Sequence, residues 1–134
     1  MKRLLFVPLL LAACPSSNTK TECMVDSDCG GDVCARDGEC LAANEIYAVK
    51  ISWTIRGSAA NASTCASSPN FYIQFDGPSQ QDTFGYEPVP CDPGQFTIDK
   101  LPKRFTQAEI GIGNTFLDAQ PISAAGSASF DLYP

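Results

Sequence analysis

Four cysteines crowd into residues 23–40, and they constrain the fold more than any other feature of this chain. Cys23, Cys29, Cys34 and Cys40 follow the spacing C-x5-C-x4-C-x5-C, and turn-forming Asp and Gly residues occupy much of the sequence between them. A segment this short cannot build a hydrophobic core and must be held by covalent cross-links. Of the three possible pairings we favour the interleaved Cys23–Cys34 and Cys29–Cys40, because it locks two overlapping loops.

The chain begins with the composition of an export signal. Lys2 and Arg3 precede the apolar run LLFVPLLL, which is far shorter than the roughly 20 residues that a membrane-spanning helix needs. The letters L-A-A-C follow at once and end at Cys14. This run resembles the lipobox of bacterial lipoproteins. The resemblance implies cleavage before Cys14 and acylation of that cysteine, which would anchor the protein to a lipid bilayer in the cell envelope, with the outer membrane expected.

The cysteine count agrees with a lipid on Cys14. The chain has seven cysteines, so six remain, an even number that suits three disulfides in an oxidising compartment. The alternative is an ordinary secretory signal that is cleaved near Ala13 and carries no lipid.

Alternating hydrophobicity predicts an all-β domain from residue 45 onward. Within residues 46–56 the odd positions are apolar and the even positions from Lys50 onward are polar, so Trp53 is expected in the core. No stretch shows a helix-length period of 3.6 residues. Shorter alternating strands are expected at residues 71–75, 95–99, 107–112 and 128–133, with turn-forming clusters between them.

These patterns predict an antiparallel β-sandwich that is preceded by a small disulfide-rich segment and a signal peptide. Cys65 and Cys91 flank the expected strand 71–75. A disulfide between them would close a loop and so raise the free energy of unfolding by roughly 3.5 kcal/mol. We therefore expect one disulfide inside the sandwich and none between the sandwich and the Cys-rich segment. The expected organisation is a signal peptide at 1–13, a tether at 14–22, a Cys-rich module at 23–41 and a sandwich at 45–134.

A second resemblance covers the sandwich. The strand with Trp53 ends in Arg56-Gly57, and residues 94–102 read GQFTIDKLP after the Pro90-Cys91 pair. Together they resemble the prealbumin-like, carboxypeptidase-regulatory-like sandwiches of secreted bacterial lipoproteins, and residues 23–41 resemble the short Cys-rich modules of such proteins. The resemblance implies a non-catalytic module with no active-site residues.

Composition removes several classes of function. The chain has no histidine, which excludes the commonest general base and the usual catalytic triads. Its net charge is −6, and loss of Lys2 and Arg3 with the signal would make it −8, so nucleic acid is not an expected partner. We expect no enzymatic activity, and a carboxylate pair such as Asp76 with Asp82 or Glu87 has no supporting signal.

Two motifs need weighing against simpler interpretations. Acids of the Cys-rich segment, beginning at Asp26, partly mimic a calcium loop, but Gly30 replaces a ligand and flanking helices are missing, so we expect no metal or cofactor. Aromatic side chains could instead bind a sugar or a partner, although edge cover and loop packing are the favoured interpretation. These aromatics are Tyr72 and Tyr133 at outward strand positions, and Phe84 and Tyr86 in the loop before Cys91.

The sequence therefore predicts a membrane-anchored, non-catalytic binding or structural module with a protein or glycan ligand that remains unidentified. The alternative is a small disulfide-stapled inhibitor or ligand-capture protein that acts through the Cys-rich segment. In that case residues 35–38 would form a protruding loop, and inhibition of a trypsin-like protease would depend on Arg36.

Overall fold

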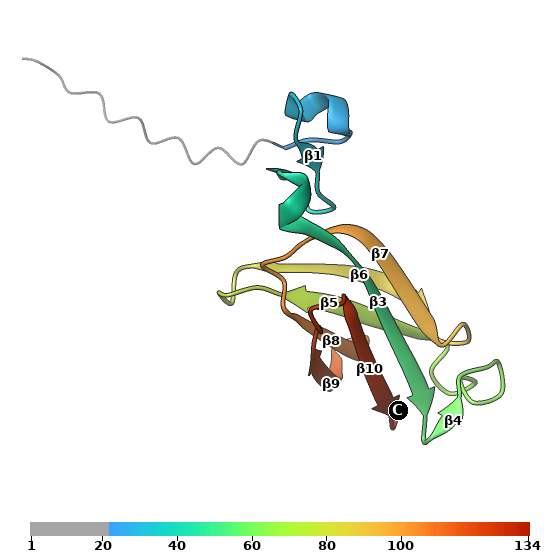
Figure 1. Cartoon of the computed structure of the whole chain (residues 1–134). Coiled ribbons are helices and arrows are strands. Elements are labelled where there is room, and N and C mark those ends of the chain that lie inside the picture. The colour runs from blue at the N-terminus through green and yellow to red at the C-terminus, as the bar shows by residue number, and fades with distance from the viewer. Residues whose placement is uncertain (1–21) are drawn as a thin grey trace, which may run out of the picture.

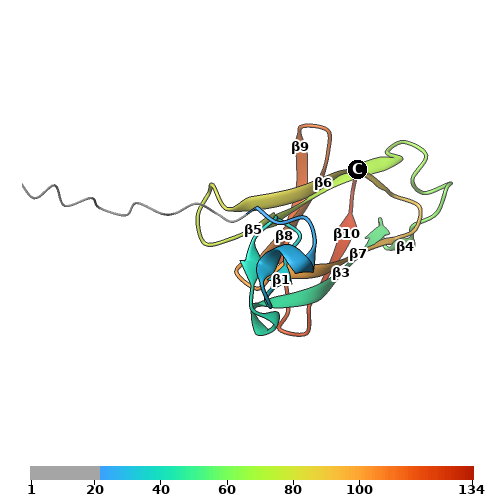
Figure 2. The same cartoon turned by 90° about the horizontal axis from the view of Figure 1, so that it is seen from above.

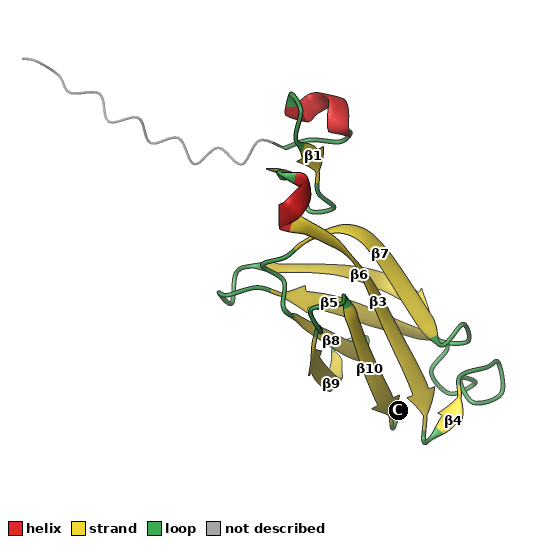
Figure 3. Cartoon of the chain, viewed as in Figure 1, coloured by secondary structure: helices red, strands yellow, loops and turns green. Residues whose placement is uncertain are grey.

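Strands dominate the computed structural model, which describes residues 22–134 (Figure 1). Figure 3 shows the two short 3-10 helices, and both lie ahead of the sandwich in the chain. Within residues 22–134, no helix has the length and apolar character needed to cross a bilayer. The elements are η1 (Asp26–Cys29), β1 (Val33–Cys34), β2 (Cys40–Leu41), η2 (Ala43–Glu45), β3 (Ile46–Ile55), β4 (Ser58–Ala59), β5 (Asn70–Asp76), β6 (Thr83–Pro90), β7 (Gln95–Pro102), β8 (Gln107–Ile112), β9 (Thr115–Pro121) and β10 (Ser127–Leu132).

Strand β3 is the centre of the first sheet, and its alternation is confirmed. Its inward residues Val49, Ile51, Trp53 and Ile55 are buried, while Lys50 is exposed. β3 pairs in antiparallel fashion with β7 and with the short β4, and β10 lies on its other side. The ten-residue strand therefore holds three partners.

The pairing of β10 with β3 is parallel, which differs from the antiparallel arrangement expected from the sequence. Phe130 lies opposite Trp53, and Leu132 lies opposite Ile55. The reason is the route of the chain, because β10 follows β9 of the other sheet and enters beside β3 by a crossover. Only a hairpin connection would have forced the antiparallel direction.

The second sheet has the order β6-β5-β8-β9 and is antiparallel throughout. Two of its strands, β6 and β9, were not predicted. The expectation that Phe84 and Tyr86 lie in a loop was wrong, because both occupy β6 and pack against the core. Pro88 and Pro90 make the sequence of β6 atypical of a strand. β6 is an edge strand, however, and an edge strand tolerates proline because one row of its N–H groups needs no partner.

Trp53 joins the two sheets in the core. Its ring packs edge-on against Phe71 of β5 at 5.8 Å between centroids, and its Nε1–H donates to the Cys91 carbonyl oxygen at 2.8 Å. Cys91 is itself bonded to Cys65, with 5.8 Å between their Cα atoms. One side chain thus contacts the first sheet, the second sheet and the disulfide-linked loops.

The Cys-rich module, residues 23–41, sits on one end of the sandwich. Figure 1 shows this module at one end of the sandwich and the C-terminus at the opposite end. Seen from above in Figure 2, the module lies over part of this end of the sandwich. The β5–β6 turn lies at the module end, because Asp82 in that turn contacts the same arginine as two module residues.

Replacing Trp53 tests this account of the core. We expect Trp53→Ala to lower the free energy of unfolding by about 3–5 kcal/mol in urea titrations, because a large cavity forms and a buried hydrogen bond is lost. Tyr133→Ala, which removes an exposed aromatic, is the control and should change stability by less than about 0.5 kcal/mol. Native-state indole fluorescence at the wavelength of free tryptophan would contradict the burial of Trp53.

Candidate functional site

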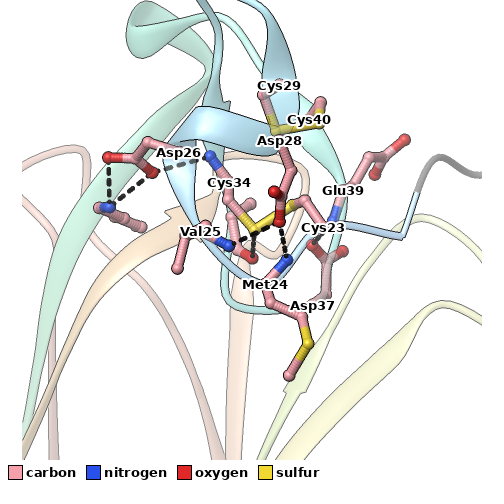
Figure 4. Close-up of a disulfide and its surroundings, with 12 residues drawn as sticks. Cys23, Met24, Val25, Asp26, Asp28, Cys29, Cys34, Asp37, Glu39 and Cys40 are labelled. Carbon is pink, nitrogen blue, oxygen red and sulfur yellow. Dashed lines mark hydrogen bonds and ion pairs between the residues drawn. A yellow bond between two sulfur atoms is a disulfide. The ribbon is translucent and has the colours of Figure 1, made fainter.

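Two disulfides hold the Cys-rich module. The structure joins Cys23 to Cys34 and Cys29 to Cys40, with Cα–Cα distances of 5.7 and 5.4 Å, which is the interleaved pairing favoured from the sequence (Figure 4). The Sγ atoms of Cys23, Cys29 and Cys40 lie within 4.8 Å of one another because the two bonds are adjacent. All three are oxidised, so they offer no thiolate to a metal. Cys14 lies outside the described residues, so its acylation stays an expectation.

The acids of the module have separate partners. Asp26 accepts hydrogen bonds from Lys100 Nζ at 2.8 and 2.9 Å and from the Cys34 amide at 3.0 Å. Asp28 accepts from the amides of Met24 and Val25, as Figure 4 shows. These donors hold the pKa of both carboxyls below the usual value. The carboxylates therefore stabilise turns and bind a lysine, and they do not converge as a calcium loop requires.

The loop at residues 35–38 is packed against the sandwich. Ala35 is buried, and the Arg36 amide donates to the Lys100 carbonyl oxygen at 3.1 Å. The Arg36 guanidinium pairs with Asp99, with Nε at 2.8 Å from the carboxylate oxygen. Arg36 is thus engaged on β7, whereas an inhibitory loop has to project away from its scaffold.

A β-bulge in β7 makes this contact possible. Between the pairs Tyr47–Leu101 and Val49–Ile98, β7 has two residues where β3 has one. The extra residue, Lys100, adopts a left-handed φ of 53°. A bulge re-aims the side chains around it. Here Asp99 and Lys100 each form an ion pair with the module.

Arg104 forms the densest ionic contact in the described part of the chain. Its Nε lies 3.1 Å from both carboxylate oxygens of Asp82, and its NH1 donates to Glu39 at 2.7 Å. NH2 pairs with Asp37, and the guanidinium lies 4.8 Å from the Phe105 ring centroid. Asp37 and Glu39 belong to the module, whereas Asp82 belongs to the β5–β6 turn. This cluster could not be predicted from the sequence, because only tertiary folding brings the three acids together.

A groove of about 500 Å³ lies on the outer face of the second sheet. The groove is open to solvent, and its volume falls in the range of small-molecule sites. It crosses β5, β6 and β8 and reaches the β8–β9 turn. The residues that line it are Tyr72, Ile73, Gln74, Gly85, Tyr86, Glu87, Glu109, Gly113 and Asn114.

Two glycines of the second sheet lie at or beside this groove. Gln74 of β5 lies between Gly85 of β6 and Glu109 of β8, and Tyr72 lies opposite Gly111 of β8. A Cβ on Gly85 would come within 2.9 Å of a backbone oxygen, and one on Gly111 would come within 2.3 Å of the Tyr72 ring. Any larger residue at either position would displace its neighbours, which include the Tyr72 ring.

Tyr72 and Glu109 form a fixed pair in the groove. The Tyr72 hydroxyl donates to Glu109 Oε1 at 2.6 Å. Burial, followed by the hydrogen bond to Glu109, raises the pKa of Tyr72 to about 12. The phenol therefore stays protonated at physiological pH and keeps donating to the carboxylate.

The other candidate residues from the sequence are spread over several elements. Asp76 accepts a hydrogen bond from Gln74, and Asp82 is bound by Arg104, so each carboxylate of the suggested pair has its own partner. Glu87 is in the groove. Tyr133 is exposed next to β10, and the exposed Phe116 of β9 escaped notice because β9 was not predicted.

Replacing Arg104 tests the ionic contact between module and sandwich. Because the Arg104 side chain is only 26% exposed, we expect Arg104→Ala to lower the free energy of unfolding by about 2–3 kcal/mol, as carboxylates lose their charged donors. Lys103→Ala is the control, since Lys103 is exposed and joins none of the ion pairs among residues 22–134. Equal stability of the two variants in urea titrations would contradict this role.

The ion pairs of β7 predict a pH dependence. Hydrogen bonds from Lys100 and Arg36 lower the pKa of Asp26 and Asp99 in the folded state. Their contribution is therefore fully present above the unfolded pKa of about 3.9 and is lost as pH falls through the lower folded values. Urea titrations at pH 7, 5, 4 and 3 should show a decline below about pH 4. Lys100→Gln should reduce this decline, whereas the control Lys50→Gln should leave it unchanged.

Comparison with protein-family models, with curated proteins and with solved structures finds no match to this chain, so its residues and geometry carry the functional argument.

Proposed function

We propose that this chain is a lipid-anchored, non-catalytic binding module of the cell envelope that takes its ligand in the outer-face groove of the β6-β5-β8-β9 sheet. The single observation that carries the binding role is the groove itself, with Tyr72, Gln74, Glu87 and Glu109 around a floor that contains Gly85. The lipobox-like sequence ending at Cys14 and the three disulfides support the envelope location. The prealbumin-like assignment is part of the same proposal.

The chemistry of the groove supports recognition rather than catalysis. With a pKa of about 12, Tyr72 is a poor base at pH 7, and its proton is already engaged by Glu109. The chain offers no histidine as an alternative base. An inhibitor that acts through Arg36 is less well supported, because Asp99 holds that side chain against β7.

The anchor is tested by metabolic labelling. We expect radiolabelled palmitate to appear on the full chain expressed in a bacterial host, and Cys14→Ala to abolish the label and release the protein from the membrane fraction. Ser17→Ala, a change in the same expected tether, is the matched control and should keep both properties. Equal labelling of the chain with and without Cys14 would overturn the anchor.

Use of the groove is tested by carboxyl footprinting. Glu87 and Glu109 should react less with a carbodiimide and glycine ethyl ester in the native envelope than in the purified protein, because a bound ligand covers them. Asp92, which is exposed in the loop after β6, is the internal control and should react equally in both settings. Equal labelling of the two glutamates in envelope and solution would contradict occupation of the groove.

A further inference from the structure

Two side chains that line the groove donate hydrogen bonds to carboxylates beside them. The Tyr72 hydroxyl donates to Glu109, and the Gln74 amide nitrogen donates to Asp76 Oδ1 at 2.8 Å. What these side chains present to a ligand is therefore mainly acceptors, namely the carboxylate oxygens of Glu87 and Glu109 and the amide oxygen of Gln74. A ligand that binds these oxygens has to supply hydrogen-bond donors.

Positive charge is missing from the whole sheet around the groove. The sequence has no Lys or Arg between residues 57 and 99 and none after Arg104, so β5, β6, β8 and β9 carry no cation. The ion pairs of residues 22–134 use Asp26, Asp37, Glu39, Asp82 and Asp99, and none of them uses Glu87 or Glu109. The two glutamates of the groove are therefore left without a protein counter-charge, and an anionic ligand would be repelled.

The two glutamates stand on opposite sides of β5. Glu87 is on β6 and Glu109 is on β8, and the sheet order places β5 between them. Two strand spacings separate the backbones of β6 and β8 by about 10 Å. A short flexible molecule with a cationic group at each end can reach both carboxylates across the groove.

From this donor count, charge and spacing, we infer that the groove binds a small organic ligand with primary ammonium groups, such as a short diamine or an amino sugar. The inference rests on the proposed function, since it names the ligand class of the same groove. An ammonium group supplies three donors and one positive charge, which meets both the free acceptors and the unpaired carboxylates.

Pairs of ligands with similar shape but different charge test whether the groove recognises the ammonium group. The purified full chain in detergent is titrated with putrescine and with 1,4-butanediol, which replaces each ammonium by a hydroxyl, while backbone amide NMR shifts are recorded. Glucosamine and N-acetylglucosamine form a second pair, and comparison of putrescine with glucosamine separates a polyamine source from an amino-sugar source. We expect saturable shifts at Gln74, Gly85 and Asn114 with at least one amine, and none with its neutral partner.

Variants of the two glutamates test whether their charges bind the amine. Glu87→Gln and Glu109→Gln should each weaken binding of the amine by up to about five-fold, and binding should also weaken at higher salt. Asp92→Asn, outside the groove, should leave the affinity unchanged, and thermal melting checks that all variants are folded.

The outcomes separate this inference from the proposed function. Equal binding of amines and neutral partners in the groove, or amine binding that survives both Gln substitutions, would overturn the ammonium inference and leave the groove as a site. Groove residues that shift with none of the four probes would also overturn it, while protection of Glu87 and Glu109 in the envelope would still support the proposed function. Absence of that protection would count against both the ammonium inference and the proposed function.

Discussion

The rest of the sandwich depends on the packing of the inward side chains of β3. β3 hydrogen-bonds to β4, β7 and β10, and its buried residues Val49, Ile51, Trp53 and Ile55 face the second sheet. Burial of such side chains contributes about 1.5–3 kcal/mol each, so this one strand supplies much of the driving force for sheet packing. Trp53 adds a polar constraint, since its indole N–H is satisfied only when the Cys91 carbonyl oxygen lies in place.

The Cys-rich module and the sandwich form one body because charged groups of opposite sign meet along their boundary. The bulge at Asp99–Lys100 holds a lysine in a left-handed conformation, which costs about 1–3 kcal/mol, and the contacts to Asp26 and the Arg36 amide offset that cost. Arg104 also forms ion pairs with two module acids and with Asp82 of the β5–β6 turn. Three of the six Lys and Arg residues among residues 22–134, namely Arg36, Lys100 and Arg104, thus hold the module to the sandwich.

Local patterns in the sequence were enough to predict the strongest elements. The alternation in β3, the inward position of Trp53 and the segregation of cysteines into a module group and a sandwich group follow from spacing alone, and the structure shows each of them. β6 and β9 escaped prediction because prolines interrupt one and polar residues such as Asp118 and Gln120 fill the other. The groove and the Arg104 cluster were out of reach, because each depends on residues that only strand pairing or turn packing brings together.

The parallel pairing of β10 with β3 has a consequence for the order in which the chain can fold as it is made. The two module disulfides each span 11 residues and can close as soon as their own segment is free. β3, in contrast, gains its last neighbour only when Ser127–Leu132 has emerged, although β3 itself is the first strand of the sandwich. Non-local pairing of this kind slows folding and leaves an unpaired strand edge open to other chains. The exposed edge of β3 is therefore covered by its own chain only at the end of synthesis.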